Sequence, residues 1–342
     1  MLPAMRTLRI LTRKCGARAF RPPASTNMSS MLAARTLHTS NSLHVKPNKP
    51  TNPPPRENPA YGVGPRGHDN VGHKRFADFD LAGKVFIVTG GAQGLGLAMA
   101  EAVVEAGGKV CCLDHAAAPS ACFHAAVSRI VPEYGGALLY RQVDVRDSAQ
   151  LDAVVASVAA EHARLDGVVA AAGIQQVTPA VEYTEPDVAR MLAVNYTGVF
   201  MAATSAARQM FKYKTRGSIC LVASMSGLVA NKGLLSPVYN SSKAAVIQLA
   251  RNMAMEWSPV RREDGAGGIR VNCISPGHVL TPMVRKNFEE VPGLREKWEA
   301  ENMMGRLADA AEFKGAVLFL LSSASSFMTG SNLVMDGGHT AW

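Results

Sequence analysis

Short apolar runs recur along the chain from residue 84 to the C-terminus. They are rich in Val, Ile, Leu and Ala and lack the alternation typical of a strand with one face in water. They predict seven strands buried on both faces, at 84–88, 109–113, 138–143, 167–172, 217–223, 268–274 and 333–335. Longer stretches of helical composition lie between them, including 97–106, 148–163, 185–213, 237–257 and 310–321. The alternation predicts a single α/β domain, a doubly wound (Rossmann) parallel sheet with helices on both faces.

A glycine-rich turn separates the first predicted strand from the first predicted helix, and its sequence is Thr89-Gly90-Gly91-Ala92-Gln93-Gly94-Leu95-Gly96. Such a turn can place a helix N-terminus against a pyrophosphate. The pattern alone would also fit an ordinary turn, but here strand, turn, helix, strand and acid follow in the order of a dinucleotide site. The acid, Asp114, could bind both ribose hydroxyls and would repel a 2′-phosphate. Because neither Ala92 nor Gln93 is basic, we predict NAD as the cofactor, with NADP as the alternative.

Tyr239 and Lys243 are four residues apart in a predicted helix, so they share one face. A free phenol has a pKa of about 10, which is too high for an efficient base near neutrality. A neighbouring ammonium lowers the pKa of a phenol, and the pair could then move a proton to or from an alcohol oxygen. As an isolated match, this spacing is common on protein surfaces.

Two further polar positions strengthen the prediction. Ser224 follows the fifth strand, 15 residues before Tyr239, where its hydroxyl could bind a substrate oxygen. Ser226 is the alternative for that role. Asn195 falls in the middle of a predicted helix, where Asn is unfavourable, so it indicates either a polar network or a simple helix kink.

Together with the run Pro276-Gly277-His278-Val279-Leu280-Thr281, these motifs resemble the short-chain dehydrogenase/reductase family over about 79–342. The resemblance implies a single domain, usually a homotetramer or homodimer. It also implies that Tyr239 is the acid/base, that Lys243 lowers its pKa and binds the nicotinamide ribose, that Ser224 steadies the substrate oxygen, and that Asn195 holds a water. The implied cofactor-binding residues are Gly90, Gln93, Gly94, Leu95, Gly96, Asp114, Asp144, Val145, Gly173, Asn195, Tyr239, Lys243, Pro276, Gly277, Val279 and Thr281.

The sequence departs from the family pattern in two places. The family's Asn-Asn-Ala-Gly after the fourth strand is Ala170-Ala171-Ala172-Gly173 here, which keeps the glycine but loses side-chain hydrogen bonds. The usual spacing of 13 residues between Ser and Tyr fits Ser226, whereas Ser224 opens the family's Ser-x-x-Gly pattern and is preferred.

Within the family, the motifs around Ser224 and Tyr239 and the C-terminal tail look most like fungal polyol enzymes, such as D-arabinitol 2-dehydrogenases, L-xylulose reductases and mannitol dehydrogenases. The resemblance therefore implies a sugar alcohol and its ketose as substrates. Polar loop residues that could bind hydroxyls are Gln175, Gln176, Asn231, Lys232 and His278, of which we expect two to touch substrate.

Two alternatives stay open. One is the same chemistry on another carbonyl, a 3-oxoacyl thioester or a secondary-metabolite ketone. The segment 283–304 could form an apolar lid for such a substrate just as well as a cover for a sugar. The other is a non-catalytic NAD-binding protein, against which the intact Ser224, Tyr239 and Lys243 set argues.

The N-terminal segment has a different composition. Residues 1–56 carry ten Lys or Arg and no acid, leaving 26 basic against 27 acidic residues over 57–342. An acid-free, Arg-rich and Ser-containing stretch over 1–44 is typical of a mitochondrial transit peptide, which predicts a matrix protein, although a basic tail without an address is the alternative. The Pro- and Gly-rich stretch 45–78 predicts a linker or arm before the domain at 79–342.

The remaining composition excludes several classes of protein. A body without excess positive charge argues against nucleic-acid binding. The chain has no apolar run long enough to span a membrane. Six Cys and nine His show no metal-ligand spacing, so we predict no metal site.

Overall fold

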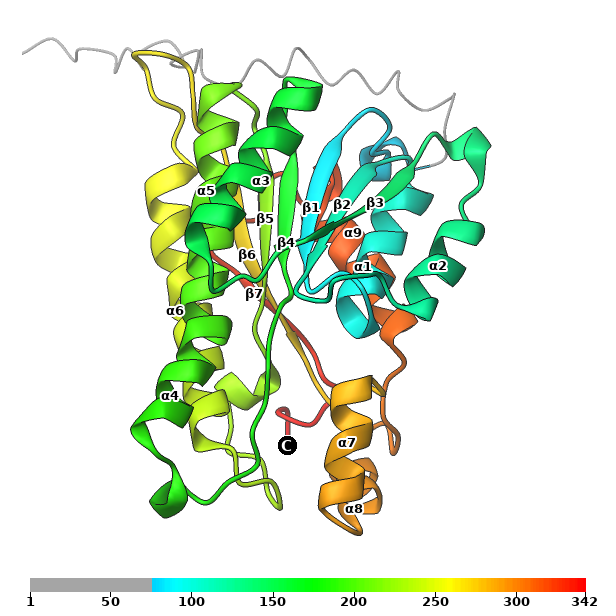
Figure 1. The fold of residues 1–342 in the computed structure, drawn as a ribbon, viewed down its shortest axis with the longest axis vertical. Helices are drawn as coiled ribbons and strands as arrows, with labels where there is room; N and C mark the ends of the chain where they lie inside the picture. The colour runs from blue at the N-terminus through cyan, green and yellow to red at the C-terminus, as the bar shows by residue number, and fades with distance from the viewer. Residues whose placement is uncertain (1–75) are drawn as a thin grey trace, which may run out of the picture. The chain divides into compact units, whose positions relative to one another are not determined.

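A seven-stranded parallel sheet forms the centre of the described part of the chain, residues 76–342 of the computed structural model (Figure 1). The strands lie in the order β3-β2-β1-β4-β5-β6-β7. Their bounds are β1 Val85–Thr89, β2 Lys109–Asp114, β3 Ala137–Gln142, β4 Gly167–Ala170, β5 Ser218–Val222, β6 Arg270–Pro276 and β7 Asn332–Met335. The predicted fold class is confirmed. The predicted transit peptide and most of the predicted linker lie outside the described residues.

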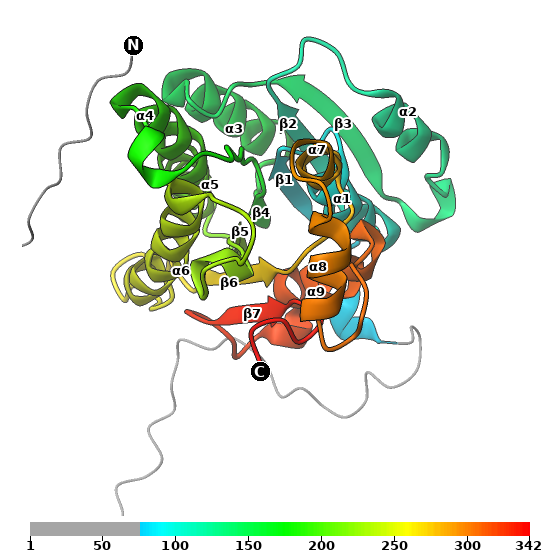
Figure 2. The same cartoon turned by 90° about the horizontal axis from the view of Figure 1, so that it is seen from below.

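Helices cover both faces of the sheet, as Figure 2 shows from below. On one face α3 (Ser148–His162), α5 (Val199–Lys212) and α6 (Pro237–Trp257) pack on one hydrophobic cluster. On the other, α1 (Gly94–Glu105), α2 (Ala121–Ser128) and α9 (Lys314–Leu321) pack on a second cluster. Successive residues of one strand enter different clusters, Ile87 the first and Val88 the second. Because both faces of the strands are buried, the sequence of each strand is a continuous apolar run.

Several helices differ from their predicted form. The stretch 185–213 is divided into α4 (Glu185–Leu192), a π-helical turn (Ala193–Gly198) and α5. The stretch 310–321 begins as a 3-10 turn, Ala310–Phe313, before α9. Among residues 76–342, no helix combines the length and the apolar character that crossing a membrane requires.

Two helices that were not predicted lie beyond the carboxyl ends of the strands: α7 (Pro282–Glu290) and α8 (Leu294–Glu301) (Figure 1). They pack on a small hydrophobic cluster of their own, in which Trp298 is almost fully buried beside Leu234 from the loop after β5. The predicted lid segment is therefore an ordered helical pair that covers the edge of the sheet where the strands end.

Candidate active site

Backbone packs directly against backbone in the turn between β1 and α1. Gly90 has a φ of +68°, and a Cβ atom there would lie 2.8 Å from the Cα atom of Ala172. A Cβ atom at Gly96 would lie 2.3 Å from the carbonyl oxygen of Gly90. Glycine is therefore required at both positions, and the N-terminus of α1 stays open to a phosphate group.

A cavity of about 450 Å³ opens at this turn, between β1 and β4, where the strand order reverses. This is the place at which a doubly wound sheet binds a dinucleotide. Nearly all the residues implied by the family resemblance line it: Gly90, Gln93, Gly94, Leu95, Gly96, Asp114, Asp144, Val145, Gly173, Ser224, Tyr239, Lys243, Pro276, Gly277, Val279 and Thr281. The glycine cradle and this lining fit a nicotinamide dinucleotide.

Tyr239 and Lys243 both project from α6 into this cavity. The Lys243 Nζ atom lies 5.6 Å from the centre of the Tyr239 ring and donates a hydrogen bond of 2.9 Å to the Val222 carbonyl. The Ser224 side chain hydrogen-bonds that of Tyr239. The structure thus brings a phenol, an ammonium and a hydroxyl together at the ends of β5 and α6.

Burial is the largest influence on the electrostatics of this group. Burial raises the pKa of the Tyr239 phenol, and the hydrogen bond from Ser224 is what opposes this rise. Burial also lowers the pKa of Lys243 to about 8. The causes of the Tyr239 shift are burial and Ser224, so the predicted role of Lys243 in lowering the pKa of Tyr239 stays a prediction.

The structure separates the two candidate serines. Ser224 lines the cavity, whereas the Ser226 hydroxyl accepts a hydrogen bond of 2.7 Å from the Asn231 amide and is not part of the lining. The Ser226 backbone N–H donates to the Ser224 hydroxyl oxygen at 3.1 Å, which fixes the Ser224 side chain. The placement favours Ser224 as the residue that meets a substrate oxygen.

Asn195 lies in the π-helical turn and is fully buried behind the cavity rather than on its wall. Its Oδ1 atom accepts a hydrogen bond of 2.9 Å from the Ile174 N–H, and its amide donates to the Ile174 carbonyl at 2.9 Å and to the Ser242 hydroxyl at 3.2 Å. Both a helix distortion and a polar network are therefore present. Asn195 ties the loop after β4 to α6, and its predicted role in holding a water stays a prediction.

The five polar loop residues from which we expected two substrate contacts all lie outside the cavity lining. Gln175 accepts a hydrogen bond from Asn287, and Gln176 accepts one from Arg190. His278 is stacked on Trp298 with a distance of 3.6 Å between ring centres. Asn231 contacts Ser226, and Lys232 is exposed. Apolar side chains from the same regions line the cavity instead: Ile174, Met283 and Val284.

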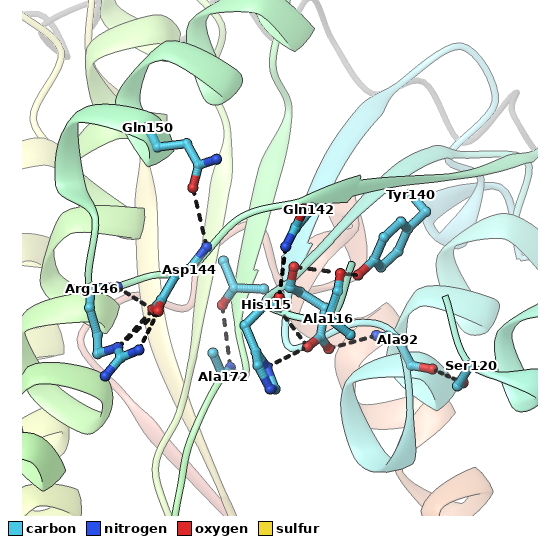
Figure 3. A network of polar contacts seen from close by, with 12 residues as sticks. Ala92, His115, Ala116, Ser120, Tyr140, Gln142, Asp144, Arg146, Gln150 and Ala172 are labelled. Atoms are coloured by element: carbon cyan, nitrogen blue, oxygen red, sulfur yellow. Dashed lines mark hydrogen bonds and ion pairs between the residues drawn. The ribbon is translucent and has the colours of Figure 1, made fainter. Parts of the chain in front are cut away.

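Three basic residues that the sequence analysis missed line the cavity, His115, Arg146 and Arg190. His115 directly follows Asp114, and Arg146 directly follows Val145, so their place after strand ends was the available signal. Arg146 forms an ion pair of 2.6 Å with Asp144 and holds the pKa of that carboxyl below its usual range (Figure 3).

The loop after β4 lacks the two Asn side chains of the family pattern. Their loss is partly offset, because the Thr89 hydroxyl accepts a hydrogen bond of 3.3 Å from the Ala172 N–H.

Several characterised proteins are similar to this chain. A short-chain dehydrogenase/reductase, notP', from Aspergillus versicolor is 38% identical over 77% of this chain and 89% of its own length. A galactitol 2-dehydrogenase from Rhizobium johnstonii is 37% identical over 77% and 98%. A ribulose-forming D-arabinitol 2-dehydrogenase from Scheffersomyces stipitis is 33% identical over 78% and 96%.

Solved structures agree with these sequences. A short-chain dehydrogenase/reductase from Mycobacterium marinum has a TM-score of 0.70 and 34% identity over 77% of this chain and 98% of its own. A gluconate 5-dehydrogenase from Burkholderia cenocepacia, in complex with NADP and tartrate, has a TM-score of 0.68 and 28% identity over 78% and 98%. A family model described as enoyl-(acyl carrier protein) reductase matches residues 90–340. The chain therefore belongs to the short-chain dehydrogenase/reductase family of nicotinamide-dependent oxidoreductases.

Proposed function

We propose that the protein transfers hydride between a nicotinamide cofactor and the secondary alcohol carbon of a sugar alcohol, D-arabinitol or xylitol, which becomes its ketose. The observation that carries the proposal is the arrangement of Ser224, Tyr239 and Lys243 at the end of the cavity opposite Asp114. The choice of a polyol is supported by the relatives that act on arabinitol and galactitol.

The chain's own residues handle the proton of this reaction. In the oxidation, the hydroxyl proton of the substrate passes to the Tyr239 phenolate while the carbon loses hydride, and in the reduction the Tyr239 phenol returns that proton as the carbon gains hydride. The bound cofactor supplies the hydride acceptor or donor. Ser224 hydrogen-bonds the same oxygen as charge develops on it, and Lys243 supplies a positive charge at the buried end of the site. Apolar Ile174, Met283 and Val284 keep water away from the reacting carbon.

A panel of pentitols, hexitols and ketoses with NADH, NAD, NADPH and NADP tests this proposal by the absorbance of the reduced cofactor. We expect turnover of D-arabinitol or xylitol, and of the matching ketose in reverse. Turnover of acetoacetyl thioesters without any oxidation of pentitols would rule out the polyol assignment.

A second candidate is reduction of a less polar carbonyl, such as a 3-oxoacyl thioester or a secondary-metabolite ketone. The apolar lining at the substrate end favours it, because hydroxyl-rich substrates need several polar partners and none of the five predicted ones lines the cavity. The same panel distinguishes the two candidates when acyl thioesters and cyclic ketones are included.

We propose NAD as the preferred cofactor, because the carboxylate of Asp114 lies at the end of β2 on the cavity wall. Replacing it, Asp114→Ala, should reduce the preference for NAD over NADP by about tenfold or more, since a ribose partner and a charge that repels phosphate are both lost. The ratio of kcat/KM values for the two cofactors is the measurement. An unchanged ratio would mean that another residue sets the preference.

We propose that residues 1–44 direct the chain to the mitochondrial matrix. The proposal is supported by the acid-free, Arg-rich composition of the segment alone. A fusion of residues 1–45 to a fluorescent reporter should enter mitochondria, and the same fusion with its Arg residues changed to Gln should not. A diffuse cytosolic signal from the unaltered fusion would contradict mitochondrial targeting.

We also propose that the protein is a homodimer or homotetramer, which its molecular mass in solution would test.

A further inference from the structure

Two amide side chains, those of Gln175 and Asn287, meet where helix α7 packs on the loop after β4. The Asn287 Nδ2 atom donates a hydrogen bond of 2.7 Å to the Gln175 Oε1 atom. Asn287 is 4% exposed, and burying a polar amide is unfavourable unless it is hydrogen-bonded. The contact therefore holds α7 against the loop, although the two residues are far apart in the chain.

Both amides are neighbours of residues that line the cavity. Ile174, which lines it, immediately precedes Gln175. Met283 and Val284 line it from α7. Asn287 comes four residues after Met283 and three after Val284, so it lies on the same face of this helix. The amide pair therefore places a polar group next to an apolar stretch of the cavity wall.

The backbone on either side of Gln175 is fixed. The Asn195 side chain binds both the N–H and the carbonyl of Ile174, each at 2.9 Å. On the other side, the Tyr183 hydroxyl donates a hydrogen bond of 2.9 Å to the Gln176 carbonyl. The Gln175 side chain can therefore gain or change a partner while its backbone stays in place relative to α6, to which Asn195 also ties the loop.

The pair offers a ligand both a donor and an acceptor. Among residues 76–342, neither amide side chain has another hydrogen-bond partner. The Nε2 group of Gln175 can therefore donate, and the Oδ1 atom of Asn287 can accept. A hydroxyl group fits this combination, because it accepts and donates at the same time. A carboxylate only accepts and an ammonium only donates, so each would satisfy half of the pair.

We propose that Gln175 and Asn287 are specificity-determining residues that bind one hydroxyl group on the non-reacting part of the substrate. The inference rests on the proposed function, since it requires a substrate with several hydroxyl groups. It supplies a polar contact that the apolar residues of the wall do not provide. The bound hydroxyl joins the loop after β4 to α7, so a polyol also strengthens the contact that holds α7 in place. An alcohol with a single hydroxyl gains nothing from this subsite.

A matched pair of alcohols tests this role: the pentitol that the protein oxidises best, and 2-pentanol, which has the same number of carbons and a single hydroxyl. We expect Gln175→Met and Asn287→Leu each to lower kcat/KM for the pentitol by about tenfold, mainly through KM, because one hydrogen bond between neutral groups is lost. Neither variant should lower kcat/KM for 2-pentanol. The ratio of the two kcat/KM values, followed by the absorbance of NADH, is the measurement.

The controls separate substrate recognition from folding. Gln248 donates a hydrogen bond of 3.0 Å to Asn252 in a second Gln–Asn pair, which is exposed on α6 and lies outside the cavity lining. Gln248→Met and Asn252→Leu should leave the ratio unchanged. Every variant should bind NADH with an unchanged Kd, measured by nicotinamide fluorescence, which shows that the cavity is intact. If Asn287→Leu does not fold, Gln175→Met still gives the result, because Gln175 is a half-buried loop residue.

Two results would overturn the inference. One is an equal loss of kcat/KM for both alcohols in Gln175→Met, which would show that the pair only holds α7 in place. The other is a ratio that neither substitution changes. If the unaltered protein oxidises pentitols, either result removes the subsite and leaves the proposed function standing. A protein that oxidises no polyol would overturn both.

Discussion

The variant Tyr239→Phe should lose about 10²- to 10⁴-fold in kcat in both directions, the range by which a positioned acid/base accelerates proton transfer. The phenol is the group on the cavity wall that can exchange a proton with the substrate oxygen while hydrogen-bonded to Ser224. Phenylalanine keeps the ring and the packing of α6 and removes only that oxygen. The initial rate of NADH oxidation with the best ketose of the substrate panel is the measurement.

NADH should still bind to this variant with a Kd close to that of the unaltered protein, because the glycine turn and the strand ends that line the cavity are unchanged. Tyr213→Phe is the matched control, since Tyr213 caps α5 outside the cavity lining and should keep full activity. Undiminished turnover by Tyr239→Phe would refute the assigned role. Lost NADH binding would show that Tyr239 positions the cofactor instead.

The strands were predictable because their physics is local. Each central strand contributes residues to hydrophobic clusters on both sides of the sheet, so its apolar run is visible without knowing its neighbours. The pair α7 and α8 could not be predicted in this way, because the buried Trp298 and the partly buried Val284 pack against residues far away in the sequence, such as Leu234. A short amphipathic helix whose partner is a distant loop has no periodic signal that stands out from a loop.

The site was predictable where a backbone requirement or a fixed spacing determines it. Gly90 and Gly96 admit no side chain, and Tyr239 and Lys243 follow from helical spacing. His115 was missed because an exposed histidine is usually a solvated one, and only its hydrogen bond to Asp114 shows otherwise. His278 was one of five candidate substrate residues because it follows a strand, yet its ring stacks on Trp298. Position along the chain placed its backbone correctly and could not fix the direction of its side chain.

The variant Lys243→Met should lose about 10²-fold or more in kcat/KM, because the site loses the positive charge beside Tyr239. The pKa of Lys243 is about 8, so the activity of the unaltered protein in the reducing direction should fall as the pH rises past that value. The Met variant should lack this decrease above pH 8 in a plot of kcat/KM against pH, which reports ionisations of the free enzyme. Lys212 is an exposed lysine on α5, and the variant Lys212→Met should keep both the rate and its decrease above pH 8.

The same variant should lose activity without losing stability, which separates a catalytic role from a structural one. Lys243 is 3% exposed and its Nζ atom donates to the neutral Val222 carbonyl, so its charge is costly to bury. Burial lowers the pKa of Lys243 from 10.5 to about 8. Below pH 8 the lysine is protonated in both the folded and the unfolded chain, so the folded state bears the full free-energy cost of burying the charge. This cost disappears as the pH rises toward 10.5. At pH 7 the Met variant should therefore melt at or above the temperature of the unaltered protein. By pH 10 the melting temperature of the unaltered protein should have risen relative to that of the Met variant. A large loss of stability at pH 7 would instead show that the ammonium holds the site together.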